Sequence, residues 1–162
     1  MAADQSQQRP VRRIEVRIRV GGDLLAASDD PLFFGVRGPQ GREFRLQLAH
    51  GRSLRRSSDD RFVLGAPDDP ETNVAHPELN DPTCPALDAG KVHSVYLRKG
   101  FEPVPNVRGL GEMDDRLEVE HVEVDIIAEG EERPQRFARG GPLWLGLVAG
   151  LLFEIEVATT ES

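Results

Sequence analysis

The chain of 162 residues contains a single cysteine, Cys84, and no long apolar run. One thiol can form neither an internal disulfide nor a thiolate metal cluster. No segment reaches the roughly 18 to 20 apolar residues that a transmembrane helix needs. The polar start of the chain also lacks the apolar centre of a secretion signal. We therefore expect a cytoplasmic protein.

The common signatures of catalysis are also missing. The sequence has no G-x-S-x-G nucleophile elbow and no Walker loop, and its four histidines do not show the H-E-x-x-H spacing of a zinc site. Adjacent carboxylates such as Asp114 and Asp115 would point apart in a strand, so they do not predict an acid–base pair. We expect no enzyme activity. An acid–base site within residues 65–90 is the alternative that the sequence leaves open.

Aromatic residues are scarce, at 6%, and the net charge of −8 is unevenly distributed. Residues 1–61 contain 12 arginines and 8 acidic residues, a net charge of +4. Residues 62–162 contain 8 basic and 20 acidic residues, a net charge of −12. A nucleic-acid interface normally needs a concentrated positive surface with stacking aromatics. We therefore expect no nucleic-acid partner.

What the sequence does contain is apolar alternation with a period of two, which is typical of half-buried β-strands. No stretch shows helical periodicity over more than two turns. Two apolar arms on either side of Gly38–Gly41 indicate a hairpin, whose first arm contains Phe33–Val36. The other strands are expected at 11–20, 43–48, 61–64, 91–98, 116–128, 135–139 and 151–157, the last with Leu151, Phe153, Ile155 and Val157 facing inward.

Two local patterns refine this interpretation. In the 116–128 strand, apolar residues occupy odd positions up to Val119 and even positions from Val122 onward. One extra residue in the alternation is typical of a β-bulge, which we expect near Glu120–His121. Phe33 and Phe34 are consecutive in a strand, so their rings face opposite sides, and one ring points away from the core, where we expect a loop or a partner to cover it.

Residues 65–90 contain five prolines and show neither period, which indicates a long wrapping or functional loop. Short strands separated by turn signals predict an all-β fold, an antiparallel β-sandwich of about eight strands with long loops. We expect a single sandwich domain over residues 11–158. It would follow a disordered leader at residues 1–10 and precede a short tail at 159–162.

The order of these motifs resembles the PLAT domain, the β-sandwich family named for polycystin, lipoxygenase and alpha-toxin. In that family the domain docks an attached enzyme or channel to lipid or to another protein. Members often carry an acidic loop after the fifth strand, where this chain has Arg98-Lys99-Gly100. The resemblance covers roughly residues 12–157, at Gly22-Asp23, Ser28-Asp29, Phe33–Val36, Gly38–Gly41, Phe44-Arg45-Leu46, Ser58–Phe62, and Phe137 with Trp144-Leu145.

The resemblance implies calcium as the one candidate cofactor. Calcium takes six to eight oxygen ligands, usually including several carboxylates from loops. The alternative is that these carboxylates are solvated and cap turns. The candidate ligands are Asp23, Asp29, Asp30 and Asp59.

We interpret the chain as a binding module that docks in trans to a protein partner or to a membrane or lipid surface. A protein partner is favoured, because the charge of −12 on the C-terminal part would repel an anionic bilayer unless the basic side alone faces it. The basic candidates are Arg12, Arg13, Arg17, Arg19, Arg52, Arg55 and Arg56, and the apolar loop candidates are Leu24, Leu25, Phe101, Val104 and Leu110.

Two alternatives stay open from the sequence. The apolar loop residues could fold back to plug the open ends of the sandwich. The whole chain could instead be a structural subunit that self-assembles through edge strands or loops into a homo-oligomer or a larger particle.

Overall fold

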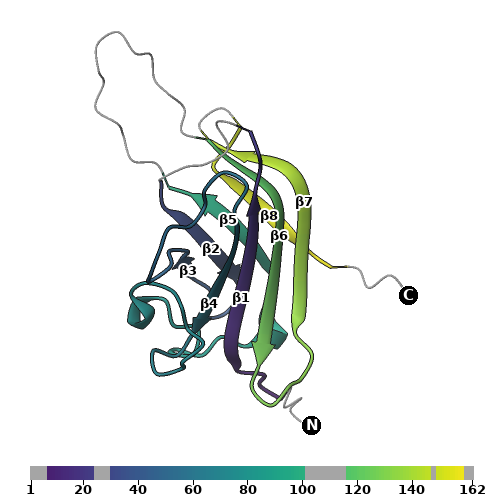
Figure 1. Ribbon diagram of the computed structural model, residues 1–162. Coiled ribbons are helices and arrows are strands. Elements are labelled where there is room, and N and C mark those ends of the chain that lie inside the picture. Colours follow the sequence, from purple (N-terminus) through teal and green to yellow (C-terminus); the bar gives the residue numbers. More distant parts are fainter. Residues whose placement is uncertain (1–6, 24–29, 101–115, 147–148, 159–162) are drawn as a thin grey trace.

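The computed structural model describes residues 7–23, 30–100, 116–146 and 149–158. Within these ranges the chain forms eight strands and two short 3-10 helices (Figure 1), which confirms the predicted all-β fold. The strands are β1 (Val11–Val20), β2 (Leu32–Arg37), β3 (Glu43–Arg45), β4 (Asp59–Gly65), β5 (Ser94–Lys99), β6 (Leu117–Ala128), β7 (Gln135–Leu145) and β8 (Leu152–Val157). The 3-10 helices are η1 (Pro77–Leu79) and η2 (Ala89–Lys91).

The eight strands form one curled antiparallel sheet in the order β3-β2-β5-β8-β7-β6-β1-β4. The sheet divides into two layers at the contact between β7 and β8. These strands pair only through Phe137 with Val157 and Ala138 with Glu156. One layer contains β4, β1, β6 and β7, and the other contains β3, β2, β5 and β8. Figure 1 shows the two layers facing each other, so the fold is a sandwich.

The core lies between the layers, because alternate residues of each strand point inward. In one layer, Val16 of β1 pairs with Phe62 of β4 on one side and with Val124 of β6 on the other, and all three are fully buried. In the other layer, the rings of Phe34 and Phe44 stack with their centroids 6.4 Å apart. Burying one such side chain contributes about 1.5–3 kcal/mol.

The predicted bulge in β6 is confirmed. The pairing of β6 with β7 shifts between Val119 and His121, and the pairing of β6 with β1 shifts at the same place. Val119 and Val122 are both fully buried although the parity changes between them. The extra residue therefore keeps the apolar residues of this long strand on the inner face.

The prediction that one of the two consecutive rings points away from the core is confirmed, but its cover is a residue of strand β5 and not the expected loop or partner. Phe34 is buried in the core, whereas Phe33 lies on the outer face of β2. The Arg98 guanidinium covers the Phe33 ring at 4.4 Å from its centroid and is itself bound to Glu43. The outward ring is thus covered from within the chain by a cation–π contact.

The long segment after β4 wraps the sandwich and covers both terminal strands of the sheet. Asn73 Oδ1 accepts a hydrogen bond from Val63 N of β4 at 2.7 Å. Asn80 is 7% exposed, and its Oδ1 accepts from Arg45 N of β3 at 2.7 Å. The segment also packs into the core through the buried Val74. These bonds therefore pair backbone groups that β3 and β4 would otherwise expose at the two edges of the sheet.

Three strand expectations need correction. The strand predicted at 43–48 ends at Arg45 as β3, and the strand predicted at 135–139 continues to Leu145 as β7. Of the four apolar residues expected to face inward around β8, Ile155 is buried and Phe153 packs against the core, but Val157 is 64% exposed. The reason is the position of β8 at the joint, where it pairs first with β5 and then with β7. Its last residues therefore lie outside the space between the layers.

No helix in the described ranges is both long and apolar enough to cross a bilayer.

Candidate functional site

Several strand ends meet at one end of the sandwich, which we call the loop end. It contains Gly21 after β1, Pro31 before β2 and Gly100 after β5. Gly100 N donates to Pro31 O at 2.7 Å, and Gly21 N donates to Glu118 O at 3.0 Å. The first bond holds the ends of β2 and β5 together within one layer, and the second holds β1 to β6 within the other layer.

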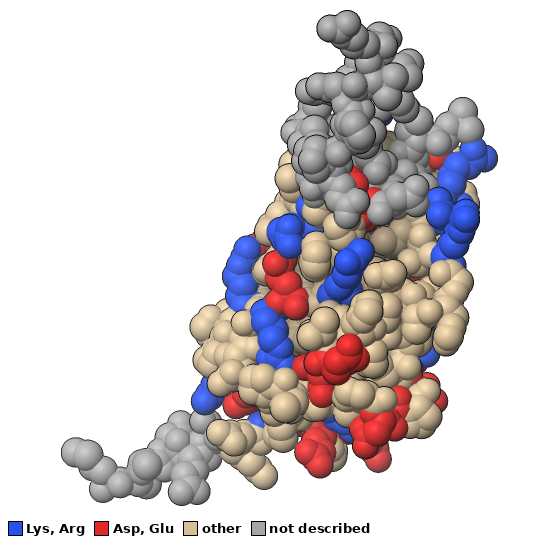
Figure 2. Space-filling view, turned by 90° about the vertical axis from the view of Figure 1, so that its left-hand side faces the viewer, with Lys and Arg blue, Asp and Glu red and all other residues tan. Residues whose placement is uncertain are grey.

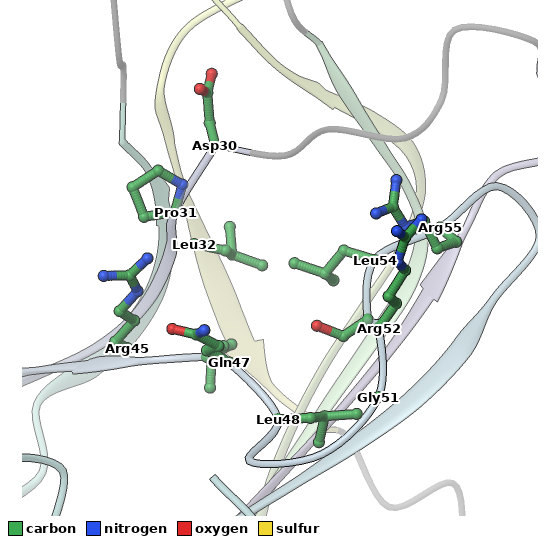
Figure 3. Close-up of a pocket in the computed structure, with 12 residues that line it drawn as sticks. Asp30, Pro31, Leu32, Arg45, Gln47, Leu48, Gly51, Arg52, Leu54 and Arg55 are labelled. Atoms are coloured by element: carbon green, nitrogen blue, oxygen red, sulfur yellow. The ribbon is translucent and has the colours of Figure 1, made fainter. Parts of the chain in front are cut away.

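A pocket with a volume of about 190 Å³ opens at the loop end, between the start of β2 and the chain that follows β3. Figure 3 shows Leu32 and Leu54 extending toward each other across this pocket. Arg45 lies on one side, and Arg52 and Arg55 lie on the opposite side. We call this site the arginine pocket. Its lining comes from residues 30–32, 45–48 and 51–55.

The arginine pocket combines an apolar floor with a charged rim. Leu32, Leu46 and Leu54 are at most 5% exposed, whereas the arginines are exposed. Within the described ranges, neither Arg45 nor Arg52 forms an ion pair with an acidic side chain. Such a rim can bind an anionic group, because guanidinium groups match the geometry of carboxylate and phosphate oxygens.

The acidic residue of the lining, Asp30, is bound by a buried lysine. Lys99 Nζ forms an ion pair with Asp30 Oδ2, and the two side chains are only 2% and 9% exposed. The same ammonium lies 3.5 Å from Gly100 O. A buried ammonium needs partners of this kind. The negative charge of Asp30 is therefore offset inside the fold and does not cancel the charge of the arginines.

The turn that carries Arg52 and Arg55 is held by Asp60. Leu54 has a left-handed backbone, with φ of 58°, which is unusual for a bulky residue. Leu54 N donates to Asp60 Oδ2 at 2.8 Å, and Ser58 Oγ donates to the same oxygen at 2.7 Å. Such a conformation persists only when its surroundings impose it. Asp60 therefore fixes the wall of the pocket that the two arginines flank.

The predicted basic residues fall into two groups. Arg52 and Arg55 line the arginine pocket, and Arg56 is exposed on the same turn.

The four predicted basic residues on β1 do not line this pocket. Arg12 is exposed there, Arg13 pairs with Asp69, and Arg17 and Arg19 pair with Asp59.

The pairing on β1 affects the pKa of Asp59. Arg17 Nη2 lies 2.7 Å from Asp59 Oδ2, and Arg19 Nη2 lies 3.8 Å from it. The hydrogen bonds from Arg17, aided by the charges of Arg17 and Arg19, lower the pKa of Asp59 below its ordinary value. These arginines therefore balance charge on the outer face of the sheet.

The four predicted calcium ligands are in different settings. Asp59 is bound by Arg17, Asp30 is bound by Lys99, and Asp23 is exposed after β1. Asp29 lies outside the described residues. Among the residues that the structure describes, no group of three or more His, Cys, Asp or Glu side chains is arranged to hold a metal ion. Calcium binding stays a prediction from the resemblance.

The apolar candidates Leu24, Leu25, Phe101, Val104 and Leu110 all lie outside the described residues. Their role as anchors or plugs stays a prediction.

Sequence reasoning missed Arg45 and the burial of Lys99 as features of the site. Arg45 has the outward parity of any charged residue in a strand, so no signal distinguished it. For Lys99 a signal existed, because it shares the inward parity of Val95 and Leu97 in β5. A charged residue at an inward position predicts a buried partner, and that partner is Asp30.

Several acidic side chains lie at the lower end of the molecule. Figure 2 shows them there on the displayed face, with basic and further acidic side chains mixed above them. The segment after β4 runs along that lower end in Figure 1 and carries the exposed Asp68, Glu71 and Glu78. These three acidic residues are therefore separated from the loop end.

Comparisons with known proteins identify the fold. No protein-family model and no curated protein sequence matches the chain. Among solved structures, the alpha-toxin of an avian strain of Clostridium perfringens matches with a TM-score of 0.58 and 18% identity, over 96% of this chain and 34% of the toxin. The alpha toxin of Clostridium absonum matches with a TM-score of 0.59 and 13% identity, over 95% of this chain and 33% of that protein.

A third structure is coral 8R-lipoxygenase, which is described as activated by calcium via a C2-like domain. It matches with a TM-score of 0.56 and 13% identity, over 90% of this chain and 17% of the lipoxygenase. The chain thus spans about a third of the toxins' length and about a sixth of the lipoxygenase. The resemblance stated from the sequence is confirmed for the fold: this chain has the PLAT-like β-sandwich found within alpha-toxins and lipoxygenases.

Proposed function

We propose that this chain is a non-catalytic binding module that docks onto an anionic lipid surface through its loop end. The observation that carries the proposal is the arginine pocket, where Arg45 and Arg52 flank an apolar floor without an acidic partner in the described residues. A membrane surface offers both anionic groups and apolar area, which this combination of rim and floor fits.

The charge distribution supports a lipid surface over a protein partner. The sequence favoured a protein because the acidic C-terminal part would repel an anionic bilayer. The exposed acidic residues of the segment after β4 lie at the lower end of Figure 1, whereas the pocket is at the loop end. Repulsion between these acidic residues and an anionic surface decays over roughly 8–10 Å at physiological salt. The loop end can therefore approach an anionic surface with its basic side foremost.

The proteins of similar fold are consistent with this choice. One of the matching lipoxygenase structures is a complex with arachidonate, a fatty acid, and the coral enzyme is the one described as activated by calcium. Calcium is therefore included as a variable in the test below. The cytoplasmic location stays a prediction from the sequence.

Vesicle flotation tests the proposal. We expect the chain to float with phosphatidylcholine vesicles that contain phosphatidylserine, and not with phosphatidylcholine alone. Raising the salt concentration should reduce flotation, because it screens the charges of the arginines. No flotation with the anionic vesicles at low salt would contradict the proposal and favour the protein partner. Flotation that requires calcium would assign the contact to carboxylates instead of arginines.

The self-assembly alternative draws no support from the edges of the sheet. Asn80 bonds to the backbone of β3, and Asn73 bonds to the backbone of β4. These bonds leave fewer edge groups free to pair with another copy.

A further inference from the structure

We propose that the arginine pocket binds one phosphate group of a lipid headgroup, contacted by Arg52 and Arg45 from opposite sides and without a metal ion. This inference rests on the proposed function and names the chemical group that the site recognises.

The size of the pocket sets the size of its ligand. Sites that bury a drug-sized ligand have volumes of roughly 300–1,000 Å³. The arginine pocket, at about 190 Å³, is smaller and half-open. It therefore accepts a single compact group, with the rest of the ligand outside. A headgroup on a lipid surface meets this condition, because its acyl chains stay in the bilayer.

The placement of the arginines selects phosphate over carboxylate. Figure 3 shows Arg45 on one side of the pocket and Arg52 on the other, with Leu32 and Leu54 between them. A carboxylate has two oxygens in one plane, directed to the same side. A phosphate is tetrahedral and directs oxygens to several sides, so that two opposed guanidinium groups can each contact it.

The Lys99–Asp30 pair makes a metal ion unnecessary. A metal bridge between an acidic pocket and a phosphate would need a carboxylate without a cation of its own. Asp30 is the carboxylate of the lining, and the buried Lys99 ammonium already occupies it. Because Lys99 offsets Asp30, the charges of Arg45 and Arg52 are available to an anion in the pocket. The charge that attracts an anion is thus built into the chain.

The pocket is also formed in advance. Asp60 holds Leu54 in its left-handed conformation, and Leu54 is only 5% exposed although it lines the pocket. A site whose wall is already ordered does not lose that conformational freedom on binding.

The test compares two double variants with the same loss of charge. Arg45→Gln/Arg52→Gln changes the pocket, and Lys91→Gln/Arg133→Gln removes two exposed basic residues that do not line it. Binding to vesicles of phosphatidylcholine with phosphatidic acid is titrated in the presence of EDTA. Thermal unfolding confirms that each variant is folded. We expect the pocket variant to bind about tenfold more weakly or worse, and the control variant to bind within about twofold of the wild type.

A second arm identifies the source of the phosphate. Inorganic phosphate should displace the wild-type chain from vesicles more effectively than sodium chloride at the same ionic strength. It should bind more weakly than the vesicles do. Inorganic phosphate that binds as tightly as the vesicles would make free phosphate the ligand and overturn the lipid source.

The other outcomes separate this inference from the proposed function. If both double variants weaken binding equally, the arginines act only through total charge, so the pocket site is wrong while docking to anionic lipid stands. If EDTA abolishes binding, the metal-free site is wrong. If the wild type does not bind anionic vesicles under any condition, both proposals fail.

Discussion

Lys99 and Asp30 form an ion pair at the loop end in which the side chains are 2% and 9% exposed. Lys99 is the last residue of β5, and Asp30 precedes β2, the strand that pairs with β5. The pair therefore links the chain before one strand to the end of its neighbour. It also holds the one carboxylate of the pocket lining in a fixed, neutralised state.

Replacing the lysine should strongly destabilise the fold. Lys99→Met leaves the Asp30 carboxylate nearly buried without its ammonium partner. Breaking a buried pair on one side costs about 3–5 kcal/mol in the free energy of unfolding, measured by urea denaturation. The matched control is Lys91→Met, because Lys91 is exposed. Equal stability of the two variants would contradict the role of the pair.

The stability of the fold should depend on pH through Asp59. Arg17 binds both oxygens of this carboxylate, at 2.9 and 2.7 Å, and this lowers the pKa of Asp59 below its ordinary value of 3.8. A lowered folded-state pKa means that the contribution is fully present above pH 3.8. It is lost as the pH falls through the lower, folded-state pKa. Asp59→Asn should therefore flatten the acid limb of the stability curve.

Chemical denaturation at a series of pH values from about 6 to 3 measures this effect. The control is Asp68→Asn, since Asp68 is exposed in the segment after β4. If both variants keep the acid limb of the wild type, Asp59 is not the residue responsible.

Asn80 should protect the edge of β3. Its Oδ1 accepts from Arg45 N, and its Nδ2 donates to the backbone oxygens of Ala75 and His76 at 3.2 and 3.0 Å. Asn80→Ala leaves these part-buried backbone groups without their side-chain partner, at a cost of about 1–3 kcal/mol. It also uncovers the edge of β3, so we expect concentration-dependent association in light scattering. Glu78→Ala, at an exposed position in the same segment, should keep the stability and the light-scattering mass of the wild type.

Gly35 should not tolerate a side chain. It pairs with Tyr96 of β5, and a Cβ at Gly35 would lie 2.0 Å from Cζ of the Tyr96 ring. The Arg37 guanidinium lies over the same ring, at 4.5 Å from its centroid. Gly35→Ala therefore requires the ring to move, at a cost of about 1–3 kcal/mol.

The control for this substitution is Gly140→Ala, because nothing lies within 4 Å of a Cβ built at Gly140 in β7. Thermal unfolding of the two variants gives the comparison. A melting temperature for Gly35→Ala as high as that for Gly140→Ala would show that the ring moves freely.

Much of the fold could be predicted from the sequence, because the direction of a side chain in a strand depends on parity alone. Val16 and Val124 alternate with charged residues and are both buried. The change of parity after Val119 predicted the bulge, and the consecutive Phe33 and Phe34 predicted an outer ring that needs a cover. The exception was Val157, which keeps the inward parity but lies beyond the joint between the layers.

The candidate site was decided by the tertiary structure. Arg45 and Arg98 have the same appearance in the sequence, as outward arginines on strands. Arg98 is hydrogen-bonded to Glu43 and lies over the Phe33 ring, whereas Arg45 lines the pocket. Alternation determined that this chain is a two-layered β-sandwich, because the residues of each strand alone show which of its two faces is buried. Which charges are paired and which surround a pocket depends on segments distant in the sequence, and only their packing brought residues 30–32, 45–48 and 51–55 together.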